Sequence, residues 1–263
     1  MTKVSLITAT WNSEETIADT LRSVAVQTHP DIEHIVVDGG SKDGTMAIVE
    51  REGAHVARAV SEADKGIYDA YNRGLRLATG EVIGFINSDD FYCSDNVIAQ
   101  VAEAFEDPEI EAVYADLVYV DQKDTSKILR HWRGRQLDDR QLRRGFVPAH
   151  PTLFLRRSVY DKAGEFDLNY RLAADHEFML RILYTHKVRA RYVPRIWVRM
   201  RVGGATGASL ANIKKQNKEI RDAQRQHGIS YPRSRFVLFK LFDRALQRLR
   251  GPFVRMPPEV TAG

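Results

Sequence analysis

The sequence contains one cysteine, Cys93, among 263 residues. A single thiol cannot form an internal disulfide and leaves no cysteine cluster for zinc, which excludes a disulfide-stapled fold and fits a reducing compartment. Long apolar runs are also missing, since none approaches the roughly 20 residues that span a bilayer. The N-terminal residues MTKVSLITA lack the layout of a signal peptide. We therefore expect a cytoplasmic protein in which Cys93 packs in the core.

The chain also lacks a strong excess of charge of either sign. The formal net charge is +4, and lysine and arginine are concentrated in the C-terminal third. This pattern favours contact with an anionic surface over sequence-specific reading of nucleic acid, so no nucleic-acid partner is expected. A hydrophobic content of 43% is sufficient for one large core. Repeats and low-complexity tracts are absent from the sequence.

Apolar runs alternate with helical patterns through the first part of the chain. Asn12 and Glu15 have the spacing of a capping box, which predicts a helix after the first strand. Such alternation predicts an α/β fold with a mostly parallel, Rossmann-like sheet flanked by helices. We expect strands over residues 4–10, 32–37, 54–60 and 82–86, and helices that end near Glu52, span 66–78 and span 95–105.

The pattern becomes less regular after a strand at 112–114. Residues 116–145 are polar and rich in Arg and Asp, as is usual for an inserted hairpin or a loop over an active site. The later pattern predicts strands at 152–155, 191–193 and 196–200 and helices at 174–183, 210–227 and 236–249. We therefore expect a catalytic domain over 1–205 and a helical C-terminal tail over 206–263.

Acidic side chains follow successive predicted strands. Asp38 follows the second strand, Asp64 the third, and Asp89 with Asp90 the fourth. One aspartate in such a place usually caps a helix or shapes a turn. In open α/β sheets, however, ligands bind beyond the carboxyl ends of the strands, and clustered carboxylates repel unless a cation or a hydrogen-bonding ligand lies among them. The set favours a site for a nucleotide diphosphate with a divalent ion.

Five separated motifs occur in one order along the chain. They are VSLITATWN, VDGGSKDGT, SEADKGIYDAYNRG, FINSDD, and AHPTLFLRRSVYDKAGEFD together with ADHEFMLRI. This series resembles family 2 of the inverting glycosyltransferases, of the bacterial surface-polysaccharide type, which have the GT-A fold. The resemblance covers about residues 3 to 205. It implies a nucleotide-diphospho-sugar donor, with a UDP-sugar favoured and a GDP- or TDP-sugar as the alternatives.

The resemblance also assigns donor-binding residues. Asp38 would accept a hydrogen bond from the base, because a carboxylate suits an imide N–H. The base and ribose would be lined by Thr8, Thr10 and Asn12, the nucleotide and diphosphate by Asp64, Lys65 and Gly66, and the sugar by Tyr68, Asp69 and Asn72. Asp43 is expected to form a turn or a cap rather than to bind the donor.

Asn87-Ser88-Asp89-Asp90 occupies the place of the family's metal motif, DXD. The first acidic position is Ser88 here, which departs from that pattern. The resemblance then implies Asp90 as the direct metal ligand, with Asp89 on the metal, the sugar or the ribose and Asn87 beside the donor. Mn²⁺ or Mg²⁺ fits hard carboxylate and diphosphate oxygens and would stabilise the departing nucleoside diphosphate.

Catalysis is assigned to the predicted helix that contains Asp175 and Glu177. Acidic residues in a first helical turn also favour the helix dipole, which is the structural alternative. The resemblance implies Asp175 as the general base for the acceptor hydroxyl, with Glu177 as the runner-up. It places His150 near the acceptor or diphosphate, and Arg181 near phosphate or an acidic neighbour. Gly203, Gly204 and Thr206 resemble a segment that closes over the donor phosphates, with Arg199 or Arg201 nearby.

The tail combines apolar and basic residues in the predicted helix over 236–249. It either packs on the catalytic domain or lies on the anionic inner face of the cell membrane as a peripheral contact. The function expected is sugar transfer to a hydroxyl of a glycan or lipid-linked glycan in bacterial cell-surface polysaccharide synthesis. The alternatives are a sugar-phosphate nucleotidyltransferase and a non-catalytic nucleotide- or glycan-binding relative.

Overall fold

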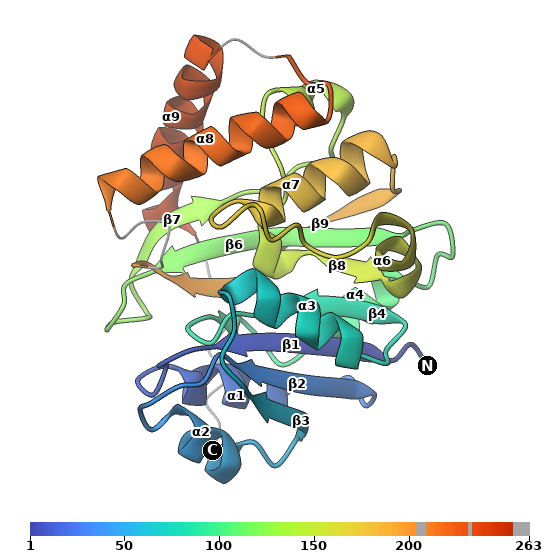
Figure 1. The fold of residues 1–263 in the computed structure, drawn as a ribbon, viewed down its shortest axis with the longest axis vertical. Coiled ribbons are helices and arrows are strands. Elements are labelled where there is room, and N and C mark those ends of the chain that lie inside the picture. Colours follow the sequence, from blue (N-terminus) through green and yellow to red (C-terminus); the bar gives the residue numbers. More distant parts are fainter. Residues whose placement is uncertain (204–208, 231–232, 255–263) are drawn as a thin grey trace.

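The computed structural model describes residues 1–203, 209–230 and 233–254, which form a mixed α/β fold around one sheet (Figure 1). Strand order in the sheet is β3-β2-β1-β4-β8-β6-β9-β5, with β7 paired to β6. The strands are β1 (Val4–Thr10), β2 (Ile32–Asp38), β3 (Val56–Ser61), β4 (Val82–Phe85), β5 (Phe91–Tyr92), β6 (Ala112–Val120), β7 (Ile128–Trp132), β8 (Phe154–Arg156) and β9 (Ala190–Arg201).

The first half of the sheet is parallel, as expected. β1 is parallel to β2 and to β4, and β2 is parallel to β3. Thr10 pairs with Asp38 at the carboxyl ends, so the loops after β1 and β2 leave the same edge of the sheet. The second half is mixed, because β8 runs antiparallel to both β4 and β6 while β6 and β9 are parallel.

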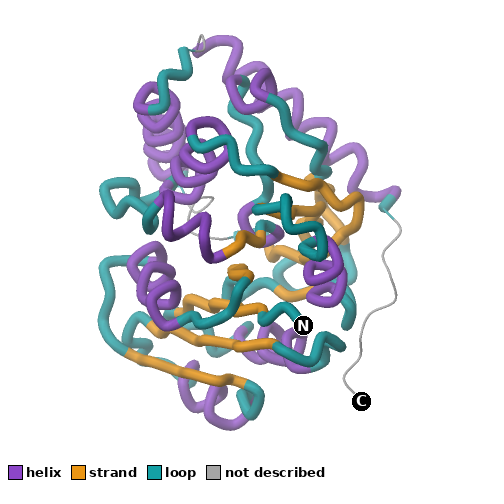
Figure 2. Tube along the Cα trace, turned by 90° about the vertical axis from the view of Figure 1, so that its right-hand side faces the viewer, coloured by secondary structure: helices purple, strands orange, loops and turns teal. Residues whose placement is uncertain are grey.

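Helices cover both faces of this sheet, as Figure 2 shows in the turned view. One face packs on α3 (Ile67–Leu77), α6 (Arg157–Ala163) and α7 (Ala174–Leu180), and the other on α1 (Ile17–Ala25), α2 (Thr45–Glu52) and α4 (Val97–Ala104). Residues of β1 alternate between the faces, with Leu6 on the α4 side and Ile7 on the α3 side. A Cβ atom on Gly74 of α3 would lie 2.3 Å from Ile7 Cγ2, so this glycine lets the helix approach the sheet.

The capping-box prediction is wrong. α1 begins at Ile17, and its N-cap residue, Thr16, makes no side-chain cap hydrogen bond. Asn12 instead adopts a left-handed φ of 48°, and its Oδ1 accepts a hydrogen bond from the Lys42 N–H at 2.9 Å. The polar side chain therefore joins the loops after β1 and β2, because Asn tolerates the left-handed conformation.

The polar segment 116–145 contains the expected hairpin, formed by β6 and β7. It continues into a short helix, α5 (Asp139–Arg143). The strands predicted at 191–193 and 196–200 form one strand, β9, whose pairing with β6 has two register shifts near Asp116. Cys93 is buried, as expected.

The tail forms two helices that lie at the end of the molecule opposite β3 (Figure 1). They are α8 (Leu210–Gln226) and α9 (Arg233–Arg250), and α9 leads into a 3-10 turn at Gly251–Phe253. α8 packs on α7 and shares its core through Ala223. α9 packs on β7, and a Cβ atom on Gly251 would lie 3.1 Å from the backbone of Leu129. The tail therefore packs on the sheet domain.

The expected boundary at residue 205, and the expected phosphate-closing residues Gly204 and Thr206, lie outside the described residues. Within the described part, none of the helices has the length and apolar character needed to cross a membrane.

Candidate active site

The loop after β2 is shaped by the buried carboxylate of Asp38. It accepts hydrogen bonds from the Gly40 N–H at 3.1 Å, the Ser41 N–H at 2.9 Å and the Ser61 hydroxyl at 2.6 Å. The Ser41 hydroxyl donates a further bond to its other oxygen. The carboxylate of Asp38 is therefore already hydrogen-bonded within the protein. A ligand would contact the turn that Asp38 holds in place rather than the carboxylate itself. Asp43 likewise acts in a turn, accepting from the Thr45 and Glu14 N–H groups.

The end of β1 has two buried threonines. The Thr8 hydroxyl lies 3.0 Å from His34 Nε2 within the sheet. Thr10 Oγ1 is buried with no hydrogen-bond partner among the described residues. Next to it, Trp11 is 66% exposed. An exposed indole at the ligand edge of the sheet is a candidate site residue that the sequence reasoning missed, although the unusual Trp within TWN was a visible signal.

The loops after β2 and β3 meet at Asp64. A Cβ atom on Gly39 would lie 2.7 Å from Asp64 Oδ2, so a larger residue here would displace the Asp64 carboxylate. Asp64 Oδ1 accepts a hydrogen bond from the Gly66 N–H at 2.8 Å, and Gly66 has a φ of 118°. The Lys65 N–H donates to Asp69 at 3.1 Å. These contacts bring the Asp38 and Asp64 loops together at one edge of the sheet.

Two residues expected to face the sugar are engaged within the protein. The carboxylate of Asp69 caps the start of α3 and forms an ion pair with Arg73 at 3.2 Å. Asn72 is buried, and both atoms of its amide bond the backbone of Phe166, at 2.9 Å each. Asn72 therefore ties α3 to the segment before α7, which corrects the expectation that it contacts the sugar.

Asp89 and Asp90 follow β4 but differ in their surroundings. Asp90 is fully buried and accepts hydrogen bonds from Asn87 Nδ2 at 2.8 Å and from the Arg201 N–H at 3.2 Å. Asp89 is partly exposed. Arg201 donates to the Asp89 carbonyl oxygen at 2.8 Å. The geometry therefore favours Asp89 over Asp90 as the carboxylate that is open to a ligand.

A divalent ion beside Asp89 and Asp90 would need further ligands from a substrate or from water. Within the described ranges, no group of three or more His, Cys, Asp or Glu side chains is arranged to hold a metal. Burial raises the pKa of Asp89, and burial together with Asp89 raises that of Asp90. A cation beside two such carboxylates would offset both effects, and Mn²⁺ or Mg²⁺ commonly takes its remaining ligands from phosphates and water.

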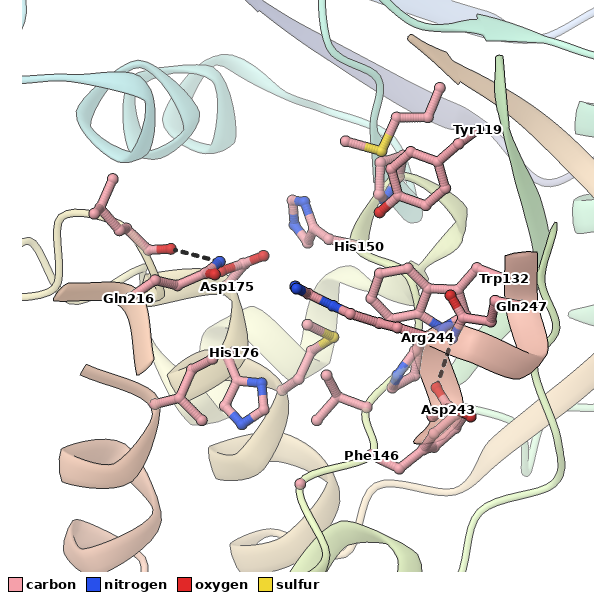
Figure 3. Close-up of a pocket in the computed structure, with 18 of the residues that line it drawn as sticks. Tyr119, Trp132, Phe146, His150, Asp175, His176, Gln216, Asp243, Arg244 and Gln247 are labelled. Carbon is pink, nitrogen blue, oxygen red and sulfur yellow. Dashed lines mark hydrogen bonds between the residues drawn. The ribbon is translucent and has the colours of Figure 1, made fainter. Parts of the chain in front are cut away.

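A cavity of about 420 Å³ lies beside these carboxylates (Figure 3). Its lining includes Tyr68, His150, Asp175 and Arg201. The Tyr68 hydroxyl donates a hydrogen bond to Asp175 Oδ1 at 2.9 Å. The His150 ring stacks on Phe85 with centroids 5.3 Å apart. Burial lowers the pKa of His150, although Asp175 opposes this, so the neutral imidazole is favoured.

Contacts of Tyr71 connect the cavity to the turn after β4 that contains Asn87, Asp89 and Asp90. The Tyr71 hydroxyl donates to Asn87 Oδ1, and Asn87 in turn donates to Asp90. The Tyr71 ring lies 5.4 Å from that of His150, centroid to centroid. Contacts through Tyr71 therefore connect the NSDD segment to His150, which lines the same cavity as Asp175.

Glu177 lies outside the lining of that cavity. It is 1% exposed and forms an ion pair with Arg181, at 2.6 Å, and a hydrogen bond with His227 Nε2, at 2.9 Å. Burial raises its pKa, but the hydrogen bonds from His227 and Arg181 outweigh this and lower it overall. Glu177 therefore joins α7 to the end of α8 through His227, while Arg181 joins Glu177 to the backbone at the end of α6. Of the two candidate bases, only Asp175 lines the cavity.

Arg199 was expected near the phosphates, but its guanidinium lies near Phe91 and the Cys93 thiol.

The tail contributes a wall of the cavity that sequence reasoning missed. The missed lining residues come from the β6–β7 hairpin and from α8 and α9, and they are Tyr119, Arg130, Trp132, Ile213, Gln216, Ile220, Arg244 and Gln247. The polarity of segment 116–145 was the signal for the hairpin, whereas nothing in the sequence placed α9 at the site.

The sequence model described as Glycosyl transferase family 2 matches residues 5–164. The chain belongs to this family. The PGL/p-HBAD biosynthesis glycosyltransferase of Mycobacterium tuberculosis (strain ATCC 25177 / H37Ra) is 33% identical over 192 residues, which are 72% of this chain and 73% of that protein. An uncharacterized glycosyltransferase of M. tuberculosis (strain ATCC 25618 / H37Rv) is 34% identical over 187 residues, covering 68% of each.

Solved structures show the same fold at low sequence identity. S. aureus TarS 1-349 in complex with UDP-GlcNAc has a TM-score of 0.68 and 20% identity, and the match covers 95% of this chain and 74% of that one. The match to another crystal structure of S. aureus TarS covers 93% of this chain and 43% of that one. Mannosyltransferase PcManGT from Pyrobaculum calidifontis, in complex with GDP-Man and Mn²⁺, has a TM-score of 0.61 and 19% identity, with coverages of 96% and 82%.

The family 2 glycosyltransferase therefore has the expected GT-A fold, which is confirmed. Membership of the family makes glycosyl transfer the reaction class and sets aside the sugar-phosphate nucleotidyltransferase.

Proposed function

We propose that this family 2 member is an inverting, metal-dependent glycosyltransferase. It moves a sugar from a nucleotide-diphospho-sugar to a hydroxyl of a glycan or lipid-linked glycan in bacterial cell-surface polysaccharide synthesis. Support comes from the relatives, which are glycosyltransferases, one of them named for PGL/p-HBAD biosynthesis. The donor assignment is supported by the structural neighbours in complex with UDP-GlcNAc and with GDP-Man.

The observation that carries this proposal is the position of Asp175. Its carboxylate lines a cavity and is oriented by the Tyr68 hydroxyl, while the competing carboxylate of Glu177 is held by Arg181 and His227. A base must reach the proton that it removes, and of these two carboxylates Asp175 is the one that lines the cavity. Asp175 deprotonates the acceptor hydroxyl, which attacks the anomeric carbon in a single displacement and inverts its configuration.

The donor lies along the loops after β1, β2 and β3. Trp11 offers an exposed ring for the base, and the turn organised by Asp38 borders the ribose. Asp89, with Asp90 behind it, would hold Mn²⁺ or Mg²⁺. When bound, this ion supplies positive charge to the diphosphate of the donor. Lys65 and Arg201 add cationic side chains near the same edge.

We place the protein at the cytoplasmic face of the membrane as a peripheral protein. Phe242, Leu249 and Phe253 are 64%, 68% and 86% exposed, respectively, near the end of the tail. The arginines that line a cavity together with Leu249 and Phe253 are Arg133, Arg195 and Arg250. Exposed apolar side chains rimmed by cations suit the interface of an anionic bilayer, where a lipid-linked acceptor is found.

The proposal is tested by incubating the protein with a panel of UDP-, GDP- and TDP-sugars and measuring nucleotide release. We expect turnover of one donor class in the presence of Mn²⁺ or Mg²⁺ and its loss on chelation. The α or β configuration of the product, read by NMR, should be opposite to that of the donor. Nucleotide release from none of the donors with either ion would leave the non-catalytic relative as the correct alternative.

A further inference from the structure

One end of the cavity, formed by the β6–β7 hairpin and α9, is lined by aromatic and cationic side chains. Tyr119 and Trp132 come from the paired strands β6 and β7, and their rings are stacked with centroids 6.5 Å apart. The Arg130 guanidinium carbon lies 3.7 Å from the Tyr119 ring centroid and 5.7 Å from that of Trp132. Arg244 comes from α9, which packs on β7, and its side chain extends beside Trp132 toward Asp175 and His150 (Figure 3). Arg130 and Arg244 therefore both line the cavity that contains the candidate base.

In the described part of the chain, these cations have no carboxylate within ion-pair distance. Within residues 1–203, 209–230 and 233–254, neither Arg130 nor Arg244 forms an ion pair. Asp243 lines the same cavity, but its carboxylate is engaged by Arg135 at 3.2 Å and by Gln247 at 2.5 Å. Burial lowers the pKa of Arg130, and Tyr119 and, less strongly, Asp243 oppose this. Arg244 and Arg248 lower the pKa further, because like charges lie close together. An anion between them would relieve that repulsion.

Buried hydrogen-bonding atoms at the same place also lack partners. Arg130 Nε and Trp132 Nε1 are buried donors with no acceptor in the described part of the chain. A buried donor without an acceptor costs free energy, so such groups in native proteins usually mark a place for water or a ligand. Arg130, Trp132 and Arg244 could together donate to the three terminal oxygens of a phosphate monoester.

We propose that this end of the cavity is an acceptor subsite that binds a phosphate group on the acceptor, beside the hydroxyl that Asp175 activates. The inference rests on the proposed function and adds the chemical class of the acceptor to it. The stacked faces of Tyr119 and Trp132 provide a platform for the sugar ring that carries the phosphate. The tail helix α9 supplies Arg244 and thereby takes part in acceptor recognition.

The experiment first fills the donor site, because the donor diphosphate is the competing ligand for these arginines. With UDP and Mg²⁺ at saturation, binding of glucose 6-phosphate and of glucose is measured by calorimetry. The sugar phosphate is expected to bind at least about tenfold more tightly than glucose, as charge-assisted hydrogen bonds imply. A second arm replaces the soluble probe with phosphatidylcholine vesicles that contain dodecyl phosphate. Tighter binding in that arm assigns the phosphate to a lipid, and tighter binding of glucose 6-phosphate assigns it to a soluble sugar.

The variants Arg244→Gln and Arg130→Gln separate acceptor binding from donor binding. Each should weaken glucose 6-phosphate binding at least about tenfold while UDP binding stays near the wild-type value. Arg225→Gln, at an exposed position on α8 outside the cavity lining, is the control and should leave both unchanged. Arg244→Lys keeps the charge and should recover part of the affinity.

Equal binding of glucose and glucose 6-phosphate by the wild-type protein, or a parallel loss of UDP affinity in both variants, would overturn the subsite. A failure of the proposed function would give a different experimental result. In that case the wild-type protein would release no nucleotide from any donor, whatever its affinity for glucose 6-phosphate.

Discussion

At the residue scale, two adjacent carboxylates have different surroundings. Asp90 is sealed beneath the site and bonded by Asn87 and the Arg201 backbone, whereas Asp89 is partly exposed. The reason is the turn after β4, in which the Asp90 N–H donates to the Asn87 carbonyl oxygen at 3.1 Å. This turn directs one acid inward and leaves the other at the ligand edge.

We predict that Asp89→Asn changes mainly metal affinity and that Asp90→Asn changes mainly stability. Asp89→Asn should weaken the apparent affinity for Mn²⁺ by more than about tenfold, a cost typical of disturbing a metal site, with little change in unfolding. Asp90→Asn should lower the free energy of unfolding by about 1–3 kcal/mol, because one buried hydrogen bond is lost. Mn²⁺ titration of nucleotide release and urea unfolding measure the two. A stable Asp90→Asn protein with impaired Mn²⁺ binding would restore Asp90 as the direct ligand.

The acidic set could be predicted from the sequence, because aspartates after strands of a parallel sheet meet at one edge. Which of them remain open to a ligand could not. Asp38 is engaged by the Ser41 N–H and by the Ser61 hydroxyl, 23 positions along the chain. The amide of Asn72, another residue expected at the donor, is engaged by Phe166, 94 positions along the chain. Hydrogen bonds over such separations depend on tertiary packing, so residue patterns placed the site but not the free side chains within it.

At the element scale, α7 separates two acids by their position on the helix. Asp175 and Glu177 are two residues apart, so their side chains point to nearly opposite sides at about 100° per residue. One side faces the cavity and the other faces α8. The sequence identified both candidates, and the neighbouring helix α8 decides between them.

A second polar link joins β1, β2 and the turn before β4. Glu33 of β2 accepts hydrogen bonds from the Ser5 hydroxyl at 2.5 Å, the Thr79 N–H at 2.7 Å and the Thr79 hydroxyl at 2.6 Å. Burial alone would raise its pKa, but these bonds, with Lys3 nearby, lower the pKa of Glu33 from 4.5 to about 2. The ionised carboxylate therefore stabilises this part of the sheet.

We predict that Glu33→Gln destabilises the protein at neutral pH by about 1–3 kcal/mol, the cost of disrupting buried hydrogen bonds. The native pKa lies below the unfolded one, so the contribution is present above pH 4.5 and is lost as the pH falls toward 2. The difference between wild type and variant should shrink over that range in urea unfolding. The exposed Glu50→Gln is the control, and a difference that does not change with pH would refute the assignment.

Most regular elements could be predicted because their patterns are local. The helix predicted at 210–227 ends one residue earlier, at Gln226, and the parallel strands β1 and β2 were also anticipated. The capping box failed because Asn12 bonds Lys42, a partner on another loop. The long β6–β9 pairing was missed because its middle lies in the polar segment near Asp116, where register shifts interrupt the pattern.

At the scale of the whole molecule, the tail completes the cavity. α8 and α9 pack on α7 and β7 and bring Gln216 and Arg244 to the space in front of Asp175. A helical tail was predictable from its periodicity, whereas its position depends on contacts between surfaces far apart in the sequence. Deleting the tail would therefore remove part of the site, and point variants are the better test of membrane contact.

We predict that the protein binds vesicles that contain phosphatidylglycerol and that a triple variant, Phe242→Ser with Leu249→Ser and Phe253→Ser, loses most of this binding. Each lost apolar side chain removes buried area at the bilayer interface. Leu168→Ser, at another exposed leucine, is the control and should float with vesicles like the wild type. Equal flotation of the triple variant and the wild type would refute the membrane contact.

The central claim is that Asp175 is the base of this glycosyltransferase, and kcat for nucleotide release from the preferred donor tests it most directly. Asp175→Asn keeps an acceptor for the Tyr68 hydroxyl and should lower kcat by about 10²- to 10⁴-fold with unchanged UDP affinity, since only proton removal is lost. Glu177→Gln should lower Tm but retain most of the wild-type kcat. A Glu177→Gln protein that folds but is inactive, beside an active Asp175→Asn protein, would contradict the claim.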